Sequence, residues 1–148
     1  MNSMAIGSSY RSTELEIAAT LIRVSNSVRV RLDNALSREN ITWAGYEVLD
    51  MLCVEGSMTY RMLSIRLDRH RTSVTSIVAG LVSSGLATRS VGSVRRDEFV
   101  VDATPSGFRV RERASRALTK AKPSILPAEC SVQLLDQLRE LERARRGD

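Results

Sequence analysis

The 148-residue sequence predicts a mainly α-helical protein with one small β-hairpin. Two observations of periodicity support this prediction. Apolar residues recur at spacings of three and four over most of the chain, as they do on one face of an α-helix. Between residues 86 and 103 the period changes, because two short β-prone runs flank a polar, turn-like segment. The composition, 43% hydrophobic and 26% charged, is that of a globular protein of one domain.

The first part of the chain predicts an arm and two helices. Residues 1–12 are small and polar, and we expect a loose N-terminal arm there. Thr13 and Glu16 fit a capping box with Thr13 as the N-cap, so a long amphipathic helix should extend from Thr13 to about residue 37. A second helix should begin after Thr42, a plausible N-cap, and end at Gly56.

Two further helices are expected close together in the middle of the chain. A short one should follow Thr59, because Leu63 and Leu67 lie four residues apart. The next should extend from about Thr72 to Gly85, with one clean apolar stripe. The members of that stripe are Val74, Ile77, Val78, Leu81 and Val82.

The hairpin strands are expected at residues 86–91 and 99–103, joined by the polar residues 92–98. A short helix, a tight turn, a second helix and a hairpin together make a winged helix-turn-helix, which we place at about residues 42–104. The sequence thus predicts a winged helix-turn-helix flanked by N-terminal and C-terminal helices.

Two C-terminal helices complete the prediction. Thr104 and Pro105 suit the N-cap and the first helical position, and this helix should end near Lys122, before Pro123. The last helix should begin near residue 127 or 128 and is marked by an apolar repeat. That repeat consists of Leu134, Leu138 and Leu141.

The surplus of positive charge lies in the middle of the chain. The formal net charge is −2 over residues 1–60, +6 over residues 61–96 and +1 over residues 97–148. Such a concentration is typical of a surface that binds a polyanion such as nucleic acid. A solvated basic surface without a partner is the alternative.

The helix predicted from Thr72 has the features of a helix that enters the major groove of DNA. The face opposite its apolar stripe is small and polar, which lets the backbone approach base edges closely. Basic residues precede it, where they can meet phosphate. The candidate DNA-binding residues are Arg69, His70, Arg71, Thr72, Ser73, Thr75, Ser76, Arg89, Arg95 and Arg96. The alternative is that these serines and threonines form an ordinary solvated face.

Two short motifs carry a resemblance to a known family. The step Gly85-Leu86-Ala87-Thr88-Arg89 after the reading helix and Thr104-Pro105-Ser106-Gly107 after the hairpin resemble the MarR family of bacterial transcriptional regulators. The resemblance covers residues 12–145. It implies a homodimer that forms through the helices at about 13–37 and 105–146. It also implies binding to double-stranded, palindromic operator DNA, often as a repressor that a small phenolic or lipophilic ligand releases.

The tip of the hairpin departs from the family pattern. The family's wing usually carries an acidic residue followed two residues later by arginine, and this pair braces the wing. Here Arg95 and Asp97 stand in the reverse order. We therefore expect Asp97 to brace the wing by pairing with Arg95 or with Arg89.

Other residues suggest a ligand site or a redox switch. Trp43 and Tyr46 lie one turn apart and could line a pocket for a small aromatic or lipophilic ligand; core packing is the alternative. Cys53 fits a buried, inert thiol, whereas Cys130 near a helix start could support a cysteine-based redox-sensing regulator. A winged-helix module that binds protein and not DNA is a further alternative.

Several functions are not expected. A lone histidine, His70, and the lack of a Cys-x-x-Cys pair argue against a metal site, and no catalytic motif suggests an enzyme or a cofactor. No apolar run approaches the roughly 18–20 residues that span a bilayer, and the N-terminus has no signal-peptide core. We therefore expect a cytoplasmic protein.

Overall fold

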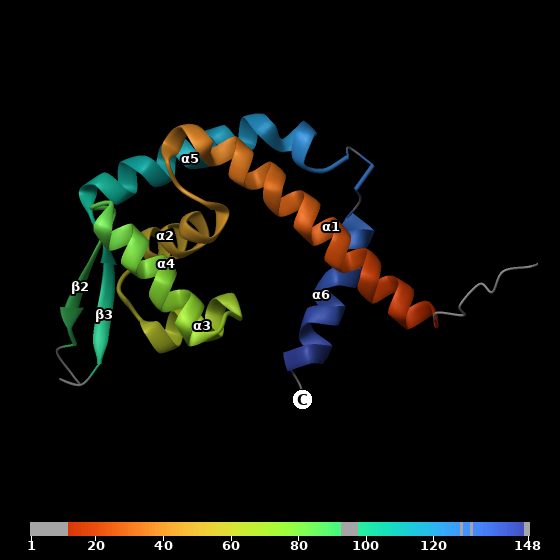
Figure 1. Ribbon diagram of the computed structural model, residues 1–148, viewed down its shortest axis with the longest axis horizontal. Helices are drawn as coiled ribbons and strands as arrows, with labels where there is room; N and C mark the ends of the chain where they lie inside the picture. Colours follow the sequence, from red (N-terminus) through yellow and green to blue (C-terminus); the bar gives the residue numbers. More distant parts are fainter. Residues whose placement is uncertain (1–11, 93–97, 128, 131, 147–148) are drawn as a thin grey trace, which may run out of the picture.

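The computed structural model describes residues 12–92, 98–127, 129–130 and 132–146 (Figure 1). Its elements follow the predicted order of a mainly α-helical chain with a hairpin, which confirms the fold class. They are α1 (Thr13–Leu36), a 3-10 helix η1 (Ser37–Glu39), α2 (Trp43–Glu55), β1 (Met58–Thr59), α3 (Tyr60–Leu67), α4 (Arg71–Ser83), β2 (Ala87–Val91), β3 (Phe99–Ala103), α5 (Pro105–Ile125) and α6 (Val132–Arg146).

The helices form a winged unit beneath two long helices. The helices α1 and α5 pack against each other and both contact α2, which in turn packs against α3 and α4 (Figure 1). The β2–β3 hairpin extends from one end of α4. The first half of α1 and the whole of α6 project away from this body at the other end.

The sheet has a third strand that the sequence did not reveal. Its order is β1-β3-β2 and both pairings are antiparallel, with Met58 opposite Val101 and Val91 opposite Phe99. A two-residue strand is too short to show the alternation of apolar and polar residues that predicts a strand. It fixes the base of the hairpin to the start of α3.

The core lies where α2, α3, α4 and β3 meet. The side chains of Leu49, Leu63, Val74, Val78 and Val101 are fully buried there. Val74 and Val78 belong to the predicted apolar stripe of α4, so the opposite face of α4 is turned outward. The core therefore sets which side chains of α4 a partner can reach.

Helix starts follow the predicted caps except at α1. Hydroxyls of Thr42 and Thr104 accept bonds from the amides of Gly45 (3.1 Å) and Gly107 (3.0 Å), as expected. The prediction of Thr13 as the α1 N-cap was wrong by one residue. Ser12 is the cap, because its extended backbone (φ −54°, ψ 151°) aims its hydroxyl at the Leu15 amide, 3.4 Å away.

The helix α5 continues through Pro123 to Ile125, so the predicted end before the proline was wrong. A proline in the last turn removes one helical hydrogen bond. Contacts to other elements favour the extra turn: Ile125 is buried, and Arg31 of α1 donates to the Ile125 carbonyl (Nη1–O, 3.3 Å).

The start of α6 also lies later than predicted, at Val132 and not near residue 127 or 128. The Cys130 amide donates to the Pro127 carbonyl over 3.1 Å, so a local turn occupies the place where the helix was expected. The predicted arm, residues 1–12, falls outside the described residues except for Ser12.

Candidate nucleic-acid interface

The N-terminus of α4 differs from those of the other α-helices whose cap residue is described. Hydroxyls of Ser12, Thr42, Thr59 and Thr104 accept a first-turn amide bond in α1, α2, α3 and α5. His70 is the N-cap of α4, with an extended backbone (φ −56°, ψ 141°), and its side chain makes no capping bond. The His70 side chain thus leaves the first-turn amides of α4 to other acceptors, and a phosphate group is one that suits this position.

A well-held turn precedes α4. Asp68 ends α3 in the left-handed region (φ 50°). The Arg69 amide donates to the Ser64 carbonyl (3.1 Å), and the Ser64 hydroxyl donates to the Arg69 carbonyl (2.6 Å). These two bonds fix the backbone of the helix-turn-helix turn on both sides of Arg69.

The outward face of α4 carries the predicted small polar side chains. Thr72, Ser73, Thr75 and Ser76 are all exposed. The Thr75 hydroxyl donates to the Arg71 carbonyl (2.9 Å), so its remaining capacity is that of an acceptor. Because no long side chain stands on this face, the helix backbone can approach a groove closely.

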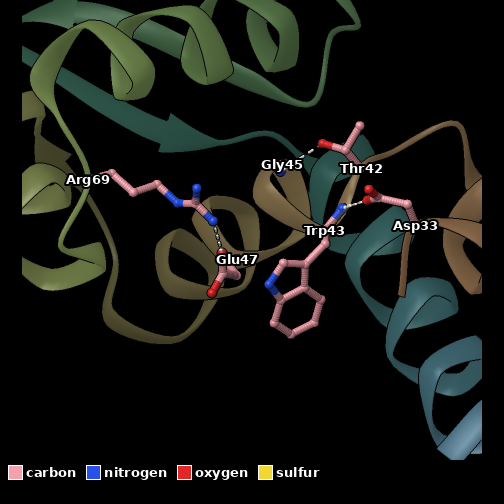
Figure 2. Close-up of polar contacts among 6 residues, drawn as sticks. All are labelled: Asp33, Thr42, Trp43, Gly45, Glu47 and Arg69. Carbon is pink, nitrogen blue, oxygen red and sulfur yellow. Dashed lines mark hydrogen bonds and ion pairs between the residues drawn. The ribbon is translucent and has the colours of Figure 1, made fainter. Parts of the chain in front are cut away.

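The arginines of this region fall into two groups. Glu55 and Glu47 of α2 form ion pairs with Arg66 and Arg69, the latter at 2.6 Å (Figure 2). The guanidinium of Arg89 on β2 lies 4.3 Å from the centre of the Phe99 ring, a cation–π contact. Among the described residues, no carboxylate forms an ion pair with Arg61, Arg71 or Arg89.

A hollow of about 490 Å³ beside α4 brings two predicted site residues together. Thr75 and Arg89 both line it, although they lie on different elements. The other lining residues are Tyr60, Ala79, Val82 and Ser83. The predicted wing-tip residues Arg95, Arg96 and Asp97 lie outside the described residues.

A larger cavity of about 660 Å³ lies between the long helices and the start of α2. Trp43 and Tyr46 line it, with ring centres 5.6 Å apart and planes inclined by 33°. The remaining lining residues are Leu32, Ser115, Leu118, Thr119, Lys122, Pro123, Ile125, Leu126, Pro127 and Cys130. The wall is mostly apolar and includes one ammonium group, that of Lys122, which suits an aromatic or lipophilic molecule.

A carboxylate from α1 holds the start of α2 beside this cavity. Asp33 accepts a bond from the Trp43 amide (Oδ1–N, 2.6 Å), next to the Thr42 cap (Figure 2). The negative charge lies at the positive end of the α2 dipole, which strengthens the contact. The indole ring of Trp43 points away from these polar groups.

The two cysteines have different surroundings. Cys53 is half-buried, and burial raises the pKa of its thiol, while the nearby Arg111 lowers it by less. A hydrogen bond to Asp50 (Nε–Oδ1, 2.6 Å) is the main cause that raises the pKa of Arg111. Cys130 is exposed and lines the larger cavity.

Within the described ranges, no three His, Cys, Asp or Glu side chains are grouped so that they could hold a metal ion. None of the helices in those ranges combines the length and the apolar character needed to cross a membrane.

Sequence reasoning missed residues whose roles depend on contacts between distant elements. Asp33 and Glu47 contact Trp43 and Arg69, and neither contact has a signal in local spacing. The α5 wall of the larger cavity was also missed. The sequence does carry one signal for this wall. A helical spacing of three and four relates four of its residues, Ser115, Leu118, Thr119 and Lys122.

Comparison by sequence gives no match: neither a protein-family model nor a curated protein resembles the chain. Solved structures do match by fold. A MarR family transcriptional regulator from Streptomyces coelicolor has a TM-score of 0.81 and 25% identity, over 93% of this chain and 98% of that one.

Two further structures carry bound molecules. A mutant MarR from E. coli, complexed with operator DNA, has a TM-score of 0.76 and 19% identity over 90% of this chain and 98% of that one. CouR from Rhodococcus jostii RHA1, bound to p-coumaroyl-CoA, has a TM-score of 0.75 and 20% identity over 90% of this chain and 94% of that one. The arrangement of helices and hairpin described above is therefore the fold of the MarR family of transcriptional regulators.

Proposed function

We propose that the protein is a dimeric, sequence-specific DNA-binding transcriptional regulator of the cytoplasm, a repressor that a small-molecule ligand releases. The observation that carries the proposal is the N-terminus of α4. There an exposed face of small side chains meets first-turn amides that no His70 side-chain bond occupies. In this proposal, residues 42–104 bind DNA and the helices at 13–37 and 105–146 form the dimer.

The chemistry of α4 suits the major groove. The groove admits one α-helix, and hydroxyl groups such as those of Thr72 and Ser76 can bond to base edges. The first-turn amides and the Arg71 guanidinium would meet backbone phosphates, which position the helix without reading sequence. The wing, with Arg89 and the predicted Arg95 and Arg96, would contact the adjacent backbone or minor groove.

The dimer is supported by apolar side chains that this chain leaves exposed. Leu135, Leu138 and Leu141 on α6 are exposed by 45%, 39% and 53%, and Ile22 on α1 by 63%. A soluble chain rarely leaves such a stripe open to water, and a second copy would cover it. Two-fold symmetry would then place two α4 helices on one face, for a palindromic operator with half-sites about 34–36 Å apart.

The ligand site of the proposal is the cavity lined by Trp43 and Tyr46. It lies between the helices assigned to the dimer and the first turn of α2, so an occupant contacts both parts. A small aromatic or lipophilic molecule fits its wall. The p-coumaroyl-CoA bound to CouR supports a ligand with an aromatic group in a protein of this fold.

The two alternatives are not favoured. A winged-helix module for protein binding leaves the basic arginines and uncapped α4 start unused, whereas one structural neighbour is complexed with operator DNA. The redox-sensing alternative rests on Cys130, which is exposed. The second cysteine, Cys53, adds nothing to it, because the raised pKa of its thiol reduces the thiolate that oxidants attack.

The salt dependence of DNA binding tests the proposal. Arg61, Arg71 and Arg89, which form no ion pair with a carboxylate of the described residues, should together with the wing tip release enough counterions for log K to fall against log salt with a slope of about −5 to −7. Fluorescence anisotropy with a duplex selected by the protein from a random library measures this slope. Arg71→Gln should reduce its magnitude by about one per subunit, and a wild-type slope near zero would contradict DNA binding by this surface.

A further inference from the structure

The ion pair between Arg69 and Glu47 joins the helix-turn-helix turn to α2. The Nη2–Oε2 distance is 2.6 Å, and the two side chains are 32% and 28% exposed (Figure 2). Both groups are thus partly withdrawn from water, where an ion pair is less screened than on an open surface. Arg69 stands two residues before the first residue of α4.

The backbone around this pair is fixed at both ends. Ser64 contacts the amide and the carbonyl of Arg69 within the turn. On the other side, Glu47 belongs to α2, whose first residue is bonded to Asp33 of α1. The Arg69 side chain therefore connects the turn that starts α4 to a helix that is itself anchored.

The charge of Arg69 is already compensated within the protein. If Arg69 turned to a phosphate, Glu47 would be left as a partly buried carboxylate without its cation, close to a polyanion. Arg71 differs, because no described carboxylate pairs with it. The two neighbouring arginines thus have different electrostatic surroundings.

We infer that Glu47 and Arg69 are a positioning pair that sets the orientation of α4 against α2, and that Arg69 does not contact DNA phosphate. This inference rests on the proposed DNA-binding function and revises the assignment of Arg69 as a DNA contact. The pair acts on sequence discrimination through the angle of α4, whereas Arg71 acts on affinity through charge.

A double-mutant cycle tests the inference, with Glu47→Gln, Arg69→Gln and both together. Affinities for a selected duplex and a random duplex are measured across a salt series. Each single change should lower the ratio of selected to random affinity by about three- to thirtyfold, and the double change no further than either single change, because the partners act as one unit. The salt slope should stay unchanged. The exchanged pair, Glu47→Arg with Arg69→Glu, should recover discrimination.

Arg71→Gln is the matched control, because it should weaken both duplexes equally and flatten the slope by about one per subunit. The inference is overturned if Arg69→Gln behaves like Arg71→Gln and Glu47→Gln binds both duplexes more tightly. That pattern would make Arg69 a phosphate contact that Glu47 restrains.

A readout without DNA separates failure of the inference from failure of the proposed function. Amide hydrogen exchange in the free protein should become faster on Glu47→Gln at Arg69 and Val74, whose amides donate to the Ser64 and His70 carbonyls, while exchange in α5 stays the same. Unchanged exchange at Arg69 and Val74 would overturn the positioning role even if the protein binds no duplex. Absence of duplex binding by the wild-type protein would instead refute the proposed function.

Discussion

Gly107 occupies the closest approach between α5 and the winged unit. A Cβ added at this position would lie 2.2 Å from the Leu86 carbonyl oxygen and 3.1 Å from Cδ1 of Leu49. The Leu86 carbonyl also accepts the Thr104 amide over 3.0 Å, so it cannot move aside without losing a hydrogen bond. The close approach of the Leu86 carbonyl and the Leu49 side chain thus explains why the Thr104-Pro105-Ser106-Gly107 step has glycine at its last position.

We expect Gly107→Ala to lower the free energy of unfolding by about 2–3 kcal/mol, because the added methyl group meets backbone and not a flexible side chain. Gly80→Ala is the matched control. Gly80 lies inside α4, and nothing stands within 4 Å of the added Cβ. In the control variant the free energy of unfolding should rise by about 0.5–1 kcal/mol, because alanine has a higher helix propensity than glycine. Urea denaturation measures both, and equal effects would refute the steric argument.

The missing side-chain cap at the start of α4 affects both the stability of the helix and its proposed DNA binding. A helix start without a side-chain cap is less stable than a capped one, and His70 supplies no cap. If the free amides bind phosphate, a cap would compete with DNA for them. Stability and DNA binding should therefore change in opposite directions at position 70.

We expect His70→Ser to raise the free energy of unfolding by about 1 kcal/mol relative to His70→Ala. The same serine should bind the selected duplex about fivefold more weakly than the alanine variant does, because its hydroxyl occupies an amide. Both variants lack the imidazole, so the comparison isolates the cap. Thermal unfolding and anisotropy titration give the two values, and a serine variant that is both more stable and tighter-binding would contradict the role of the amides.

Elements with strong local signals could be predicted from sequence, and elements that depend on distant contacts could not. The apolar stripe of α4 is a local feature, and its members Val74, Val78 and Leu81 are buried, although Val82 is exposed. The Thr104 cap of α5 is also local and is present. The extension of α5 past Pro123 depends on Arg31, which is far away in sequence. The late start of α6 depends on a turn at Cys130 that competes with helix.

The same contrast between local and distant contacts applies to the candidate site, of which the sequence predicts one part and not another. The exposed face of α4 follows from helical periodicity alone, since its opposite face must enter the core. The pairing of Arg69 with Glu47 joins residues on two helices, and no spacing rule predicts which arginine of a basic cluster finds a carboxylate. Charge counts locate the basic region but do not distinguish Arg69 from Arg71.

The complete assembly is expected to contain two copies of the chain. All described side chains of α6 up to position 144 are exposed, so this helix gains little from its own chain. A partner that covers the apolar positions of α6 and α1 would bury the stripe and stabilise both helices.

We expect light scattering at micromolar concentration to give the mass of a dimer. Leu138→Arg should shift the protein toward the monomer, because it places a charge in the proposed interface. Val54→Arg is the control, since Val54 is an exposed apolar residue of α2, 67% accessible and away from α6. A monomeric wild-type protein, or equal dissociation by both changes, would refute this interface.

The place of Trp43 has an optical consequence. The chain has a single tryptophan, and its ring lies in the wall of the larger cavity. The ultraviolet emission of the unlabelled protein on excitation near the red edge of the indole band therefore comes from one known position. Occupancy of that cavity and binding of duplex at α4 can accordingly be followed in one sample through two separate signals, the intrinsic emission and the anisotropy of a dye on the duplex.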